Sequence, residues 1–177
     1  MRNVTAFGLA VAVLGAGTVA RADIFNVYLQ GQGGVSGNDT APGPTLGLEV
    51  GANVLALQAY FAVDDYVTHG TVKRAILGLG TGIGLAGWRL SGRAGAGLMF
   101  ENNGVFGMMD PVGDRSGFVA RAGVAFDRQL AAAVYLGLGV DGEYFAIKPT
   151  DDSALDTSVH TGADVLGSLR LRFELGI

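Results

Sequence analysis

The sequence predicts an all-β chain whose eight antiparallel strands close, up and down, into a transmembrane β-barrel. Apolar and polar residues alternate along most of the chain, as they do when successive side chains of a strand point to opposite faces. The alternating segments number eight, and long and short connections follow one another between them. Charged residues make up only 16% of the chain, against 49% hydrophobic residues, which is a poor composition for a surface that meets water.

The last segment, residues 158–177, shows the alternation most clearly. One parity is apolar from Val159 to Leu175 apart from Thr161, and the other carries every charged residue of the segment. An ordinary strand has ~5–6 residues. A strand that crosses a bilayer at a tilt needs ~9–11 residues in the apolar zone and extends beyond it. This segment is therefore expected to be the closing strand of a membrane barrel.

Seven further segments share this period, so the chain divides into the ranges 24–33, 45–52, 54–63, 74–85, 88–100, 117–126, 131–144 and 158–177. Tight turns are expected near 51–53, 86–87 and 127–129. Longer polar loops are expected at 34–44, 64–73, 101–116 and 145–157. This alternation places all four long loops at one end, as in outer-membrane barrels with short periplasmic turns.

Residues 1–22 have the pattern of a secretory signal peptide. Arg2 precedes the apolar stretch 6–20, and Ala20-Arg21-Ala22 forms an A-x-A cleavage signal before Asp23. The mature barrel is then expected to span 23–177. Loss of Arg2 and Arg21 would leave ten basic residues against 16 acidic ones, a net charge of −6, which argues against nucleic-acid binding.

The second parity of each segment carries Gly, Ala, Ser, Gln, Tyr and a few charges, where a soluble barrel would show many Lys, Glu and Thr. We therefore predict that the apolar face meets lipid and the second face fills the lumen. The alternative is a soluble periplasmic barrel that binds an apolar ligand. Trp88, Tyr28 and Tyr144 fall near segment ends, as in an aromatic belt.

Parity assigns eleven charged residues to the lumen: Glu49, Arg74, Arg89, Arg93, Arg121, Asp141, Glu143, Asp164, Arg170, Arg172 and Glu174. Unpaired charges in a confined interior are costly, so six bases against five acids predict a paired network that fills the lumen. The alternative is a narrow, porin-like pore.

An enzymatic alternative is an outer-membrane lipid hydrolase. Ser158 and His160 share a face, and Asp141 or Glu143 could orient the histidine, which would supply a nucleophile, a base and an acid. The acidic loops, in which Asp64 and Asp65 are included, are expected to be solvated. No metal site or cofactor is predicted, because the chain has no Cys and only two His, without ligand spacing.

These features together resemble the small outer-membrane barrels of the OmpA/OmpX type: the Ala20-Arg21-Ala22 site, the eight segments, the alternating loops and the terminal F-x-L-x-I of Phe173, Leu175 and Ile177. The resemblance implies that the terminal residues are recognised by the outer-membrane assembly machinery. It also implies residence in the outer membrane of a Gram-negative-type envelope, among its lipids and lipopolysaccharide. We expect a monomeric, non-enzymatic barrel with a structural or surface-interaction role and an unidentified loop partner.

Overall fold

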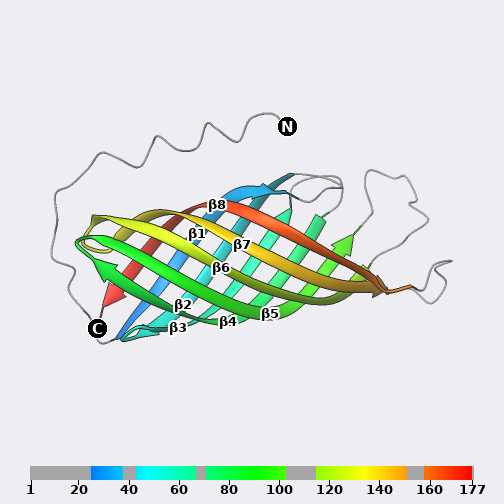
Figure 1. Cartoon of the computed structure of the whole chain (residues 1–177), viewed down its shortest axis with the longest axis horizontal. Coiled ribbons are helices and arrows are strands. Elements are labelled where there is room, and N and C mark those ends of the chain that lie inside the picture. The colour runs from blue at the N-terminus through cyan, green and yellow to red at the C-terminus, as the bar shows by residue number, and fades with distance from the viewer. Residues whose placement is uncertain (1–24, 38–42, 67–70, 103–114, 151–157, 177) are drawn as a thin grey trace.

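In the computed structural model, eight strands form one closed antiparallel barrel (Figure 1). The structure describes residues 25–37, 43–66, 71–102, 115–150 and 158–176. The strands are β1 (Phe25–Ser36), β2 (Gly43–Val54), β3 (Leu57–Tyr66), β4 (Thr71–Leu85), β5 (Trp88–Asn102), β6 (Arg115–Ala131), β7 (Val134–Pro149) and β8 (His160–Gly176). The predicted fold class is confirmed. No helix among the described residues could span a membrane.

Each strand pairs with its neighbours in sequence, and β1 pairs with β8 to close the barrel. A row of paired residues that starts at Asn26 crosses all eight strands and returns to β1 at Ser36, ten residues further along. Such a stagger requires tilted strands. Figure 1 shows the strands running obliquely to the long axis of the molecule.

The alternation of the sequence becomes an outer apolar surface and a charged interior. Leu79 on β4 is 71% exposed, while Arg74 on the same strand is 1% exposed. On β8, Leu169 is 55% exposed and Arg172 is completely buried. The distribution of a water-soluble protein is thus inverted.

Three two-residue turns lie at one end of the barrel, at residues 55–56, 86–87 and 132–133, and β8 ends there too (Figure 1). The turn at 86–87 was predicted correctly. The turns predicted at 51–53 and 127–129 were wrong, because these polar residues lie within strands. Asn53 and Asp127 are buried in the lumen, where polar side chains continue the strand pattern.

The predicted loops were too long for the same reason. β3 continues to Tyr66, and β7 continues to Pro149. Asp64, expected in a solvated loop, is a strand residue and is 3% exposed. Polarity at the loop end therefore marks inward-facing strand positions as well as loops.

Two tyrosines fill part of the interior beside glycines. Tyr60 pairs with Gly78, which pairs in turn with Gly95, and an added Cβ at either glycine would collide with the Tyr60 ring or hydroxyl. Tyr28 stands against Gly51 in the same way and is 4% exposed. The predicted place of Tyr28 in an aromatic belt was wrong, because its phenol has a buried acidic partner inside the barrel, Glu49.

Candidate functional site

The candidate site is the charged lumen, which consists of three clusters along the barrel axis. The central cluster is built around Arg93 of β5. Its guanidinium contacts both carboxylate oxygens of Asp141, with Nε–Oδ1 at 2.9 Å and Nη2–Oδ2 at 2.6 Å, and also pairs with Glu49 of β2. The Tyr28 hydroxyl donates to Glu49 Oε1 at 2.8 Å. One arginine thus joins two carboxylates from strands on either side of it.

The loop-side cluster consists of two arginines and two acids. Arg74 of β4 pairs with Glu143 of β7, and Arg121 of β6 pairs with Asp64 of β3. Arg121 also contacts Glu143 at 2.5 Å. All four side chains are at most 3% exposed. Closer to the loops, the Ser36 hydroxyl donates to Asp164.

The turn-side cluster closes the opposite end. Arg89 of β5 pairs with Glu174 of β8 and donates to Asn53 Oδ1 at 3.1 Å. Arg172 Nη2 lies 2.7 Å from Glu174 Oε1, and its guanidinium carbon lies 3.5 Å from the centre of the Tyr28 ring. Glu174 therefore holds two arginines near the barrel mouth.

Four of these ion pairs cross the lumen rather than follow its wall. The pairs β2–β5, β3–β6, β4–β7 and β5–β8 each join strands that are three apart in a barrel of eight. Directly opposite strands are four apart, so each pair is a chord across the interior. An eight-stranded barrel has just enough interior for its side chains, and these chords occupy it.

The structure places all eleven of the predicted lumen residues on strands. Nine are in the ion pairs described above, Asp164 accepts a hydrogen bond from Ser36, and Arg170 lies beside the central cluster. Arg170 donates to Gln30 Oε1 at 2.7 Å and lies 3.9 Å from Glu49. Its Nε and Nη1 have no hydrogen-bond partner among the described residues.

Sequence reasoning missed two buried acids, Asp64 and Asp127. Both were assigned to loops or turns because they stand in runs of polar residues. The available signal was parity, since Asp127 continues the inward set of Arg121 and Ala125. The Asp127 carboxylate is 1% exposed and has no hydrogen-bond partner within the described ranges, and it lies across Gly137 from Arg170.

A pocket of about 430 Å³ opens at the turn end of the barrel. Asn26, Asn53, Arg89, Glu174 and Tyr135 line it together with residues of the two-residue turns. Polar walls and buried polar atoms without protein partners are the conditions in which internal water binds. The turn end of the lumen therefore has room for water beside polar side chains.

The hydrolase residues are not assembled as a triad. Ser158 and His160 are exposed at the loop end, where His160 pairs with Ile147. Asp141 is held by Arg93, and Glu143 by Arg74 and Arg121. Neither acid is therefore available to orient the histidine.

The other alternative, a soluble barrel with an apolar ligand cavity, does not fit this geometry, because polar and charged side chains occupy the middle of the lumen.

Phe173 and Leu175 of the predicted assembly signal lie on the outer face, 46% and 67% exposed. Ile177 and the predicted signal peptide, residues 1–22, lie outside the described residues. Recognition by the assembly machinery and cleavage after Ala22 remain predictions.

No family model and no curated protein sequence matches this chain. Solved structures do. The N-terminal β-barrel domain of OprF from Pseudomonas aeruginosa is 13% identical, with a TM-score of 0.63, over 85% of this chain and 97% of that one. Neisserial surface protein A is 12% identical, with a TM-score of 0.56, over 84% and 96% of the two chains. At this identity the likeness establishes the fold, which is that of small outer-membrane barrels, as predicted.

Proposed function

We propose that this chain is an integral outer-membrane protein that acts as a closed scaffold with a structural or surface-interaction role, presenting four loops outside the cell. The main support for placing the protein in the membrane is the inverted distribution of apolar and charged residues. A surface with Leu79 and Leu48 more than 60% exposed would aggregate in water, whereas lipid accepts it. The fold of the two solved barrels supports the same placement.

The ion pairs that cross the lumen support the proposal that it is closed. Arg93 joins Glu49 and Asp141 in the middle of the barrel, and the loop-side cluster adds two further chords. Opening a continuous water path would require these buried charges to separate. Removing one partner of a buried pair typically costs 3–5 kcal/mol, so separation without a new partner is unfavourable.

Membrane placement is tested by electrophoretic mobility of the outer-membrane fraction, with and without boiling. A folded barrel resists the detergent and migrates differently until it is boiled. Recovery of the protein in the soluble periplasm, with no change in mobility, would contradict the proposal.

The closed lumen is tested in planar bilayers. We expect no steady conductance from the wild-type barrel. Arg93→Ala removes the central bridge, and Lys148→Ala, on the outer face, serves as its control.

The second candidate function is a narrow pore. It is favoured by the turn-end pocket and by the unpartnered polar atoms of Asp127 and Arg170. Steady wild-type conductance that Arg93→Ala alters and Lys148→Ala leaves unchanged would establish this alternative and refute the closed scaffold.

A further inference from the structure

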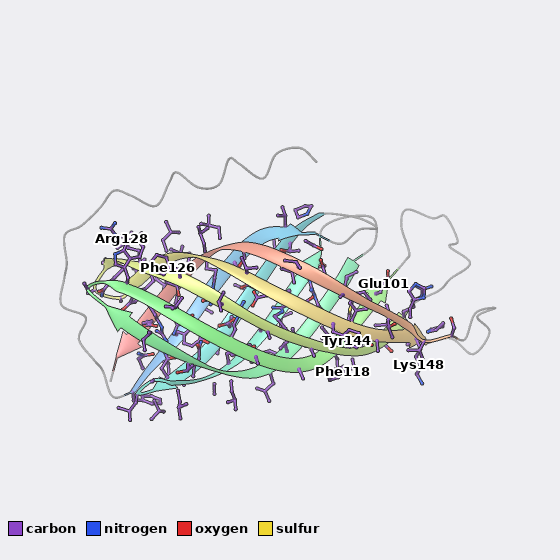
Figure 2. The ribbon with its side chains drawn as sticks, viewed as in Figure 1. Glu101, Phe118, Phe126, Arg128, Tyr144 and Lys148 are labelled. Carbon is purple, nitrogen blue, oxygen red and sulfur yellow. The ribbon has the colours of Figure 1, made fainter. Side chains whose placement is uncertain are left out.

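One cation lies among apolar residues on the outer surface near the turn end. Arg128 follows the outward positions Val124 and Phe126 of β6, and its strand neighbours are Trp88 of β5 and Leu136 of β7. The other charged outward positions that the structure describes, Asp65, Lys73 and Lys148, stand near the loop end. Figure 2 shows Phe126 and Arg128 at the turn end and Lys148 at the other.

The three side chains form an ordered stack. The Trp88 and Phe126 rings are 4.6 Å apart and 13° from parallel. The Arg128 guanidinium carbon lies 5.0 Å from the centre of the Trp88 ring, which is a cation–π contact. The backbone N–H of Gln129 donates to the Gly87 carbonyl at 2.8 Å and ties the two strands together beside the stack. The contact with the Trp88 ring and the pairing of β5 with β6 therefore hold the Arg128 guanidinium in place.

Arg128 has no ion pair with any acid in the described part of the chain, although its lumen-facing counterparts have acidic neighbours. A guanidinium surrounded by apolar side chains requires a counter-charge or water. At the edge of a bilayer the available anions are the phosphates of lipid headgroups. Guanidinium binds phosphate with two parallel hydrogen bonds, which suits it to this ligand better than a lysine ammonium.

We propose that Arg128, Trp88 and Phe126 form a binding site for the phosphate of an anionic glycerophospholipid in the leaflet at the turn end. The proposal rests on the membrane placement argued above. Arg128 binds the phosphate, while the stacked rings contact the glycerol and the upper acyl chain. This site favours anionic over zwitterionic lipid, and it does so only at the turn end and on the side of the barrel that β5 and β6 form.

Trp88 is the single tryptophan of the chain, so its fluorescence reports on this site alone. The protein is purified from membranes and reconstituted in vesicles of phosphatidylcholine and phosphatidylglycerol. Either lipid is replaced in turn by a form brominated close to the glycerol, which quenches tryptophan on contact. The ratio of quenching by the two brominated lipids measures the local enrichment of the anionic one and cancels changes in the emission of Trp88 itself.

A cation near an anionic lipid contributes about 1 kcal/mol, so we expect roughly five-fold enrichment of phosphatidylglycerol beside Trp88 at low salt. Arg128→Gln should remove the enrichment, Arg128→Lys should keep part of it, and Lys148→Gln, at the opposite end, should leave it unchanged. Equal quenching by both lipids in the wild type would overturn the site while leaving the membrane placement intact. Absence of quenching by either lipid would overturn the placement and the site together.

Discussion

At the scale of single residues, several large inward side chains of the lumen pair with a glycine on the neighbouring strand. Gly123 pairs with Asp141, and Gly137 pairs with Asp127. An added Cβ at either glycine would collide with the carboxylate beside it. The interior of an eight-stranded barrel is narrow, so at these two positions the glycine leaves the space that the carboxylate occupies.

We expect Gly123→Ala to lower the free energy of unfolding by about 1–3 kcal/mol, because the new methyl group displaces Asp141 from Arg93. Gly92→Ala is the matched control, since a Cβ there meets nothing within 4 Å, and its effect should stay within about 0.5 kcal/mol. The free energies of unfolding of the two variants are measured by urea unfolding of the barrel in vesicles. Equal effects of the two variants would show that crowding in the lumen is not what requires a glycine at position 123.

At the scale of elements, two of the three two-residue turns have left-handed backbone. Ala86 has a φ of 50° and Gly87 a φ of 80°, as in the type I′ turns that suit the twist of a hairpin. Leu55, in the turn between β2 and β3, has a φ of 56°. A left-handed conformation costs a non-glycine residue roughly 1–2 kcal/mol, and Leu55 is 73% exposed, so few contacts offset that cost.

Leu55→Gly should therefore raise the free energy of unfolding by about 1 kcal/mol, because glycine adopts this φ without the clash. Leu57→Gly is its control: Leu57 is 70% exposed but begins a regular strand, where glycine should cost about 0.5–1 kcal/mol. Unfolding midpoints of the two variants should move in opposite directions. A fall for both would mean that Leu55 is stabilised by contacts of its side chain.

At the scale of the whole molecule, the outer apolar surface fixes where the barrel sits. Its middle contains Leu79, and Val159 lies just before β8 at the loop end. Both side chains are more than 60% exposed, so substitutions there disturb no internal packing. The cost of a charge then depends on depth in the bilayer alone.

We expect Leu79→Arg to destabilise the barrel in vesicles by about 2–4 kcal/mol and Val159→Arg by about 0–1 kcal/mol. The comparison is made by reversible unfolding in vesicles and repeated in detergent, where the difference should shrink. Similar costs at both positions in vesicles would contradict the proposed membrane position.

The strand count, the two faces and most charges of the lumen could be predicted because parity is a local property. Arg93 and Asp141 belong to the inward set of their strands whatever lies across from them. The partners could not be predicted. Arg93 meets Glu49, which is 44 residues away in sequence, only because the ten-residue stagger brings β2 and β5 to the same height.

The errors at turns and loops had one physical origin. Asp64, Asp127 and Asn53 are polar, and polarity was taken to mark turns and loops, whereas in this barrel it also marks the interior. The prediction of Tyr28 in an aromatic belt was wrong for another reason: a tyrosine near a strand end suits both a membrane interface and a lumen, and only its partner Glu49 distinguishes them.

The alternation of apolar and polar residues was therefore sufficient to define eight strands, an up-and-down barrel and a lipid-facing surface, because period two follows from backbone geometry. Closure and stagger settled the rest: which arginine crosses to which carboxylate, which glycine makes room, and that Arg128 stacks on Trp88 outside the barrel. The crossing ion pairs join strands three apart in the barrel, so their distances depend on the register of the strands between them. The glycine and Arg128 contacts depend on the register of two neighbouring strands.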